Sequence, residues 1–407
     1  MLDLAKLARE IPGISKHLSQ EAAASHQRLE KAKVLLQQAK VRQEELLEIR
    51  EQWSDRLIFA AATPLEDLDT CIDIKPTPES HSVFATDGSQ ISPSHHEIAY
   101  CYLINIGRIM LHYGQSLHPL LDSLPEVYYK PEDLYVSKQW GIRTEEWMGY
   151  RRSVCEAQML AEIACRWVLP PGSHYDVPNL AMVDGSLIYW FLDALPAEAR
   201  DCILNPILAA WEQLRETKIP LMGYVSASRS TEATNFLRLQ ACPYENPNCV
   251  VNCSRDEVSE NNFNPTNRHP CQVVEPLRDA NLWSHLLAPG QRSTLWESNL
   301  HILDLYDESQ RVYFCYVNVG SEIARIEVPA WVAKDSSLFD RSLSIMLSQV
   351  SKGYGYPVAL AEAHNQAVVR GGDRARFFAL LEQQMIRAGL KNVGISYKET
   401  RKRGSIA

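Results

Sequence analysis

The chain has 407 residues, of which 45% are hydrophobic and 22% are charged, and its formal net charge at pH 7 is −9. This is the composition of an ordinary globular protein with one large or two ordinary domains. The acidic balance argues against a protein that coats nucleic acid through bulk positive charge. Local basic patches and metal-dependent contacts with phosphate stay open.

Residues 1–6 lack the charged-then-apolar layout of a secretory signal peptide. No run approaches the roughly 18 apolar residues that a membrane-spanning helix needs. We therefore expect a cytoplasmic protein with no membrane segment. In that compartment its ten cysteines are reduced thiols or metal ligands, and a disulfide framework is not expected.

The first 58 residues predict a separate N-terminal helix. No Pro or Gly occurs between Ser15 and Trp53, and small or apolar residues recur every three or four positions: Leu18, Ala22, Leu29, Ala32, Leu36, Ala39 and Leu46. This spacing predicts one long amphipathic helix. It can pack on its own domain, or it can contact a second copy or a partner protein.

Residues 80–395 predict the main domain, preceded by a Pro- and Asp-rich linker over 60–80. Its first elements are expected to be a strand over 82–90, a two-stranded hairpin over 96–113 that turns at 105–107, a polar Tyr-rich connection, a helix over 145–168, a strand over 180–187, a helix over 196–216 and a strand over 220–226. This order of three strands, helix, strand, helix and strand is that of the ribonuclease H-like α/β fold, a mixed sheet flanked by helices.

The C-terminal part continues the alternation of strands and helices. We expect a helix from residue 281, a hairpin of strands 312–319 and 323–328, helices over 335–352 and 358–369, and a basic tail over 396–407.

In two of the predicted strands a short apolar run ends at an Asp, which is followed at once by Gly-Ser at a tight turn. Asp87 precedes Gly-Ser in the strand over 82–90, and Asp184 precedes Gly-Ser in the strand over 180–187. An Asp before Gly is often a turn former, and one copy alone would favour that explanation. If the two strands are neighbours, however, their carboxylates repel each other unless a cation lies between them. The repetition therefore favours a site.

A third carboxylate is expected on the helix between those strands, where enzymes of this fold place a Glu facing both aspartates. The helix over 145–168 offers Glu156, and also Glu162 on nearly the same face. Three carboxylates suit hard divalent ions such as Mg²⁺ or Mn²⁺. Two such ions about 3.5–4 Å apart can activate a water and stabilise the leaving oxygen of a phosphodiester. The pattern predicts a metal-dependent phosphodiester hydrolase.

From about residue 80 to residue 370 the sequence resembles the NurA nucleases. The motifs that carry the resemblance occur in the family's order: Asp-Gly-Ser-Gln from Asp87, Arg-Arg-x-x-x-Glu ending at Glu156, Val-Asp-Gly-Ser-Leu around Asp184, Arg-Ile-Glu-Val-Pro from Arg325, and Gly-Tyr-Pro followed by Ala-His at His364. The resemblance implies a manganese-dependent DNA endo- and exonuclease that acts on single-stranded and duplex DNA in end resection during double-strand break repair. It also implies a homodimer that works with a HerA-type hexameric ATPase.

Carried across residue by residue, the resemblance makes Asp87, Glu156 and Asp184 metal ligands. It makes His364 a further ligand or a proton carrier, and Tyr356 an active-site tyrosine. The residues alone leave His364 open, because a histidine among small side chains can reach toward a site or be an ordinary surface or core histidine.

Arg229 lies just after the strand over 220–226. It can contact a phosphate, or it can be a solvated loop charge.

A cysteine-containing insertion over 242–271 departs from the family pattern. Its four cysteines have the spacing C-x6-C-x3-C-x17-C: Cys242, Cys249, Cys253 and Cys271. Four thiolates can hold Zn²⁺ or an iron–sulfur cluster, with His269 as an alternative ligand. The paired C-x2-C of zinc knuckles is missing, however, so partly buried free thiols stay open.

Two other functions share the fold. Actin-like ATPases and sugar kinases use two Asp-Gly strand turns to hold nucleotide phosphates, but they repeat the fold and place Gly-Gly before a late helix, whereas Gly371-Gly372 is expected after its helix here. A non-catalytic DNA-binding partner is the other alternative. It would have no reason to keep carboxylates that repel each other.

Overall fold

The computed structural model describes residues 3–93, 99–169, 174, 176–253 and 269–389. By its contacts the chain divides into two compact units: unit 1 comprises Met1–Ile74, Tyr224–Asp304 and Arg311–Glu327, and unit 2 comprises Lys75–Gly223, Leu305–Gln310 and Val328–Ala407. No helix among the described residues has the length and apolar character needed to cross a membrane.

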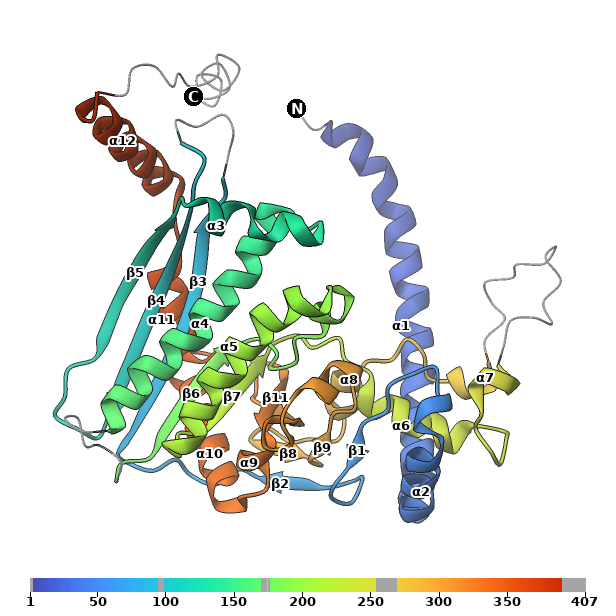
Figure 1. Cartoon of the computed structure of the whole chain (residues 1–407). Helices are drawn as coiled ribbons and strands as arrows, with labels where there is room; N and C mark the ends of the chain where they lie inside the picture. Colours follow the sequence, from blue (N-terminus) through green and yellow to red (C-terminus); the bar gives the residue numbers. More distant parts are fainter. Residues whose placement is uncertain (1–2, 94–98, 170–173, 175, 254–268, 390–407) are drawn as a thin grey trace. The chain divides into compact units, whose positions relative to one another are not determined.

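Unit 2 contains the strand and helix order of the ribonuclease H-like fold (Figure 1). Its elements are β3 (His81–Ile91), β4 (Tyr102–Tyr113), β5 (Leu120–Tyr128), α3 (Pro131–Tyr135), α4 (Thr144–Val168), β6 (Asn179–Asp184), α5 (Ala197–Glu216), the first residues of β7 (Leu221–Val225), α9 (Ala330–Ala333), α10 (Ser336–Lys352), α11 (Val358–Ala367) and α12 (Gly371–Arg387), with short 3-10 helices at Val136–Trp140, Trp190–Ala194 and Glu308–Gln310. The strands lie side by side in the order β7-β6-β3-β4-β5. β3 is parallel to β6 and antiparallel to β4, which is antiparallel to β5. The predicted fold class is confirmed.

The predicted hairpin over 96–113 is wrong, in the part that lies within the described residues. Residues 102–113 form one strand, β4, and the third strand is β5, in the segment expected to be a polar connection. β5 contains Pro125, which lies opposite Asn105 of β4. Proline cannot donate to a strand ladder and is tolerated mainly in edge strands. β5 ends the strand order, which explains why its sequence gives a weak strand signal.

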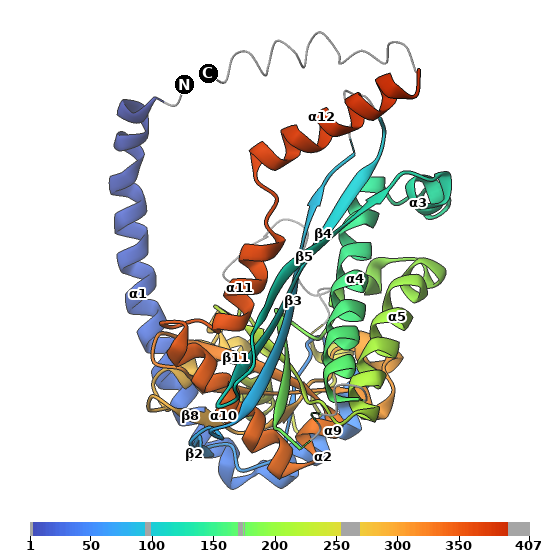
Figure 2. The same ribbon diagram turned by 90° about the vertical axis from the view of Figure 1, so that its left-hand side faces the viewer.

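Helices α4 and α11 cover opposite faces of this sheet (Figures 1 and 2). α4 presents Val154, Ala157 and Ala161 to the interior, and these small side chains let the helix lie close to the strands. On the other face Gly107 of β4 makes room for α11: a Cβ at Gly107 would lie 2.3 Å from the carbonyl oxygen of Ala363. Both helices therefore reach β3 and β4 at short range.

Unit 1 contains the N-terminal helices, short strands and the cysteine-containing segment. Its elements are α1 (Leu4–Val41), α2 (Gln43–Trp53), β1 (Thr63–Pro64), β2 (Cys71–Asp73), α6 (Glu232–Ala241), α7 (Cys249–Asn252), α8 (Asp279–Trp283), β8 (Gln291–Ser293), β9 (Trp296–Glu297), β10 (Val312–Asn318) and most of β11 (Ile323–Pro329), with 3-10 helices at Ser54–Arg56, Pro270–Gln272 and His301–Leu305. β10 pairs antiparallel with β8 and β9, which pair in turn with β2 and β1. Residues 60–80 are thus more than a linker, because β1 and β2 belong to this sheet.

The predicted single N-terminal helix is two helices. α1 starts at Leu4, and the chain leaves helical geometry at Arg42 (φ −115°, ψ 23°) before α2 begins. The small and apolar residues that recur every three or four positions form a stripe along the helix. From Leu29 onward this stripe is buried in one core with aromatic residues of the same unit, including Phe236, Trp283 and Trp296. Leu18 and Ala22 are exposed. Only the C-terminal part of the stripe is therefore used for packing within the chain.

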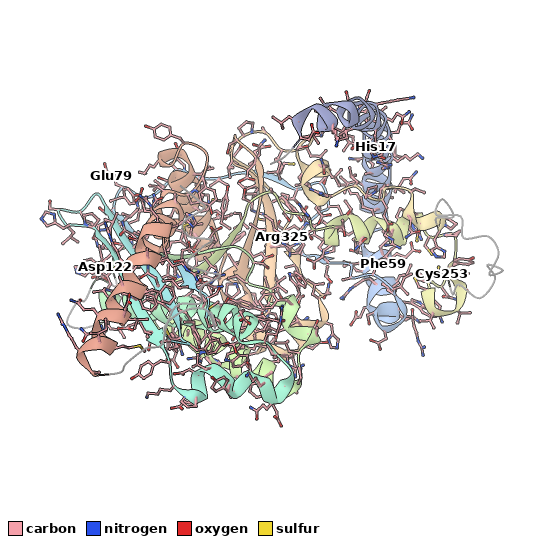
Figure 3. All side chains as sticks on the ribbon, turned by 90° about the horizontal axis from the view of Figure 1, so that it is seen from above. His17, Phe59, Glu79, Asp122, Cys253 and Arg325 are labelled. Atoms are coloured by element: carbon pink, nitrogen blue, oxygen red, sulfur yellow. The ribbon has the colours of Figure 1, made fainter. Side chains whose placement is uncertain are left out.

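A buried ionic group in unit 1 is centred on Arg325 (labelled in Figure 3). Its guanidinium contacts Glu232 at 2.9 Å and Glu327 at 2.6 Å, and it lies 3.6 Å from the ring centroid of Phe314. Burying charges is costly unless each has a partner. The Arg-Ile-Glu motif of β11 thus has a structural explanation within unit 1.

We expect Gly107→Ala to lower the free energy of unfolding by about 1–3 kcal/mol, the usual cost of overpacking, because the added methyl meets the backbone of α11. The control is Gly149→Ala in α4, where a Cβ meets nothing within 4 Å. That change is expected to be neutral or to stabilise by up to about 1 kcal/mol, since alanine is the better helix former. Urea unfolding followed by circular dichroism distinguishes them. Equal effects of the two changes would contradict the close packing of α11 on β4.

Candidate active site

The pairing of β3 with β6 brings the two aspartates together. The parallel register ends at Thr86 opposite Val183, so the next residue on each strand, Asp87 and Asp184, lies beside the other. β6 ends at Asp184, as expected, but β3 does not end at Asp87 and continues paired with β4 to Ile91. The expectation that both strands stop at their aspartate is therefore wrong for the first one.

Helix α4 places Glu156 over these two residues. The hydroxyl of Thr86 donates to the carbonyl oxygen of Glu156 at 3.0 Å. Gly88 gives the helix room, since a Cβ there would lie 2.3 Å from Oε1 of Glu156. Glu162 instead forms an ion pair with Arg166 at 2.8 Å. Of the two candidates, the structure brings Glu156 to the aspartates.

The aspartates oppose the ionisation of Glu156, and Asp87 opposes that of Asp184. Burial, and then the charges of Asp87 and Asp184, raise the pKa of Glu156 to about 7, against the effect of Arg152, whose Nε lies 3.2 Å from Oε1 of Glu156. Burial and the Asp87 charge also raise the pKa of Asp184, while a hydrogen bond from Tyr356 acts in the other direction. Neighbouring carboxylates need a cation nearby if all of them are to stay ionised.

These side chains line a common cavity. Its wall is formed by Thr86, Asp87, Ser153, Glu156, Ala157, Val183, Asp184, Tyr189 and Trp211. Among the described residues no group of three or more His, Cys, Asp or Glu side chains already stands in an arrangement that could hold a metal ion. The structure therefore shows the carboxylates gathered, and binding would have to draw them closer.

The loop between α10 and α11 positions Tyr356. Tyr354 and Gly355 have positive φ angles of 56° and 114°. A Cβ at Gly353 would lie 1.9 Å from the carbonyl oxygen of Tyr356, so only glycine fits this tight turn. The turn directs the Tyr356 hydroxyl to the carboxylate of Asp184.

Helix α11 positions His364 beside Asp87. The His364 Nδ1 lies 2.8 Å from Oδ2 of Asp87. The histidine side chain is 63% exposed, and the aspartate side chain is 22% exposed. Two residues of the sheet hold the C-terminal end of this helix: Ser89 donates to the carbonyl oxygen of Ala367, and Asn105 donates to the same oxygen at 2.7 Å. The ring is thus fixed at the carboxylate and open to solvent.

Each residue of the first Asp-Gly-Ser motif therefore has a separate task. Asp87 supplies a carboxylate, Gly88 makes room for α4, and Ser89 holds α11. The second copy works differently, because Gly185 has a positive φ of 120° and the Ser186 hydroxyl accepts the backbone N–H of Ile188 at 3.0 Å. The second motif ends a strand, whereas the first runs through one.

Sequence reasoning missed several residues that shape this site: Gly88, Ser89, Asn105, Gly107 and Arg152. Arg152 occurs in the Arg-Arg-x-x-x-Glu motif but received no role, although its spacing of four from Glu156 on a helix predicts an ion pair. The supporting roles of Asn105 and Gly107 depend on α11, which is distant in the sequence, so no local pattern could have indicated them.

The other predicted candidates lie in unit 1. Arg229 is exposed in the loop between β7 and α6, and its contact with phosphate stays a prediction. Cys242, Cys249, Cys253 and Cys271 line one cavity. The basic tail over 396–407 falls outside the described residues.

Comparisons with known proteins agree with this geometry. Residues 81–369 match the model of the NurA domain family. The structure is similar to the crystal structure of the NurA nuclease from Sulfolobus solfataricus, with a TM-score of 0.50 and 11% identity over 95% of this chain and 98% of that one. A likeness to LC9-RNase H1, a type 1 RNase H with the type 2 active-site motif, has a TM-score of 0.19 and 9% identity over 39% of this chain and 70% of that one. So small an overlap supports no conclusion.

No curated protein matches the sequence. The family model nevertheless covers well over half of the chain and includes all five predicted site residues of unit 2: Asp87, Glu156, Asp184, Tyr356 and His364. The chain therefore belongs to the NurA domain family of metal-dependent nucleases.

Proposed function

We propose that the chain hydrolyses phosphodiester bonds of DNA at the site formed by Asp87, Glu156 and Asp184. The observation that carries this proposal is the convergence of two adjacent strand carboxylates and one helix carboxylate. The helix carboxylate is Glu156, and burial first, then the charges of the two aspartates, raise its pKa to about 7. An arrangement that is unfavourable in the free protein is understandable if a cation is bound during function.

The donor set fits a hard divalent ion. Carboxylate oxygens are the ligands that Mn²⁺ and Mg²⁺ prefer, and Asp87, Glu156 and Asp184 would hold it. When bound, one or two such ions supply the positive charge that activates water and stabilises the leaving oxygen of a phosphodiester. The family resemblance favours Mn²⁺.

The neighbouring side chains orient this site and move protons. The Tyr356 hydroxyl fixes the carboxylate of Asp184 through its hydrogen bond. His364 contacts Asp87 through Nδ1 and exposes the rest of its ring. Imidazole is the side chain that most often transfers protons in enzymes, so His364 can carry a proton to or from a substrate bound at this surface. Arg152 lies next to Glu156 and can contact a phosphate group.

Substrates and partners follow from the family resemblance. We expect cleavage of single-stranded and duplex DNA, a role in end resection at double-strand breaks, a homodimer, and cooperation with a HerA-type ATPase in the cytoplasm. The first half of α1 supports a protein contact. It exposes apolar residues at alternating spacings of three and four, the pattern of a coiled-coil seam: Leu4, Leu7, Ile11, Ile14 and Leu18.

The position of Gly371-Gly372, which the sequence offered as an argument against an ATPase, does not decide the question. Gly371 and Gly372 follow α11, as expected, but they also begin α12. Because the sequence did not predict α12, it did not show that a Gly-Gly pair precedes a late helix here. The NurA family match still argues against an ATPase. ATP hydrolysis without DNA, together with no cleavage of DNA in Mn²⁺, would favour the ATPase.

We expect Asp87→Asn and Asp184→Asn each to lower the rate of DNA cleavage by about a hundredfold or more, since loss of a ligand should cost at least as much as loss of an outer partner. DNA binding should be retained, because the changes remove negative charge. Labelled single-stranded and duplex DNA incubated with Mn²⁺, Mg²⁺ or EDTA measures cleavage, and a gel-shift assay measures binding. Persistent cleavage by both variants would show that the site is wrong.

Glu156→Gln and Glu162→Gln form a matched pair on one helix. The first should lose cleavage to a similar extent as the aspartate variants, because Glu156 lies over the two aspartates. The second should retain it, because Glu162 is paired with Arg166. The same cleavage assay decides, and activity lost only in Glu162→Gln would reverse the assignment.

Glu156 should also make the stability of the metal-free protein depend on pH. Its pKa is about 7 when folded, above the ordinary value of 4.5, so between these values the folded chain holds a proton that the unfolded chain lacks. The stability that this proton contributes is therefore fully present below pH 4.5 and is lost as the pH rises to about 7, which lowers the free energy of unfolding by up to about 3 kcal/mol.

Urea unfolding in EDTA from pH 4.5 to 8, compared with Glu156→Gln, isolates this effect. Glu156→Gln should lack the fall in the free energy of unfolding that the ionisation of Glu156 causes. Mn²⁺ in excess of the chelator should restore the stability of the wild-type protein at pH 8. Identical pH profiles for the two proteins would mean that Glu156 ionises freely.

A further inference from the structure

The four cysteines of the insertion converge although they come from three separate elements of unit 1. Cys242 follows the last turn of α6, Cys249 begins α7, and Cys271 lies in the 3-10 helix Pro270–Gln272. The backbone N–H of Cys253 donates to the carbonyl oxygen of Cys249 at 3.0 Å, so one helical turn puts these two thiols on the same side. All four line one cavity, together with Phe59 (labelled, with Cys253, in Figure 3).

The thiols are close enough to influence one another. Burial first, and then the neighbouring Cys249 and Cys271, raise the pKa of Cys253 to about 11. The pKa of Cys242 is raised as well, by burial and by the same two neighbours. None of the four is in a disulfide. They are therefore four sulfur donors that line one space.

A buried guanidinium faces this cluster. Nη2 of Arg238 lies 3.6 Å from the sulfur of Cys271, and its Nη1 lies 2.8 Å from a carboxylate oxygen of Glu275. The guanidinium also lies 3.8 Å from the ring centroid of Phe59, and its side chain is 6% exposed. Ordinary buried thiols need no such partner. The guanidinium thus places a positive charge beside one of the four sulfurs.

We propose that Cys242, Cys249, Cys253 and Cys271 bind one structural Zn²⁺ in a tetrahedral site. Four protons leave the thiols on binding, and the resulting complex of one Zn²⁺ with four thiolates has a charge of −2, which Arg238 partly balances. The four sulfurs must move closer to one another to reach ligand distance, since no metal-binding arrangement exists yet among the described residues.

The alternative ligand from the sequence, His269, lines the same cavity. Its backbone carbonyl oxygen accepts the backbone N–H of Gln272 at 2.9 Å, and its own backbone N–H donates to Oε1 of Gln272 at 2.8 Å, so its main chain begins the 3-10 helix that carries Cys271. The site would join α6, α7 and that helix, and so fasten the two ends of the segment between Cys253 and Cys271. It is separate from the carboxylates of unit 2 and does not depend on the proposed nuclease activity.

The test measures zinc in the full-length reduced chain carrying Asp184→Asn, which weakens metal binding at the carboxylates. After incubation with zinc and passage over a chelating resin, we expect one zinc per chain by mass spectrometry of the metal. Adding Cys253→Ser or Cys271→Ser to this chain should lower the amount of bound zinc per chain more than tenfold. The matched control is Cys202→Ser, because Cys202 is an exposed thiol of α5 in unit 2, and it should keep the zinc.

Two further measurements cover variants that fail to fold. Co²⁺ bound to the Asp184→Asn chain should show the intense visible absorption of a tetrahedral thiolate site. Zinc should slow the alkylation of the four cysteines, but not of Cys202, at least tenfold, and a strong chelator should reverse this. A chain that retains no zinc, or Cys253→Ser and Cys271→Ser chains that retain all of it, would overturn the proposal. Finding iron and acid-labile sulfide in the purified chain would mean that the cysteines hold an iron–sulfur cluster and would also overturn the zinc proposal.

Discussion

The site depends on a single register. Because β3 and β6 are parallel and pair up to Thr86 and Val183, the residues that follow are two aspartates on neighbouring strands. Glu156 then adds a third carboxylate from α4, and its pKa of about 7 shows how strongly burial and the two aspartates oppose its charge. The surrounding contacts each address this excess of negative charge: a guanidinium beside Glu156, a histidine beside Asp87 and a hydroxyl beside Asp184. These contacts hold the carboxylates in place for the metal ion that we propose.

Two glycines allow helices from both faces of the sheet to reach the same aspartate. Gly88 follows Asp87 and faces α4, while Gly107 lies opposite Asp87 on β4 and faces α11. A side chain at either position would push one helix outward and with it Glu156 or His364. The site is therefore a place where the sheet carries little side-chain volume, and where carboxylate and imidazole come from opposite layers. Because this geometry belongs to helices and sheet together, it is rigid in a way that a loop-borne site is not.

The sequence predicted the fold class of unit 2 and most of its strands and helices, because these depend on local pattern, but it misplaced the third strand and did not predict α12. The sequence-based prediction failed for residues that are required by a contact with an element distant in the chain. Asn105 and Gly107 look like a turn, yet Asn105 holds the end of α11 and Gly107 makes room for it. Pro125 looks like a loop residue, yet it occupies an outer strand. Glu156 and Glu162 could not be separated by helical spacing alone, since only the gap left by Gly88 selects between them. Departures from local preference thus marked the site.

The two candidate metal sites differ in chemistry, and this affects how any metal experiment must be interpreted. Carboxylate oxygens favour Mn²⁺ or Mg²⁺, whereas thiolates favour Zn²⁺. EDTA would remove ions of both kinds, so loss of cleavage in EDTA alone cannot be assigned to Asp87 and Asp184. Loss of zinc from the cysteines would act through the stability of unit 1, as for other structural zinc sites. Loss of manganese would act on the reaction itself. Activity that returns with Mn²⁺ alone belongs to the carboxylates, whereas activity that also requires Zn²⁺ shows that the nuclease needs an intact cysteine cluster.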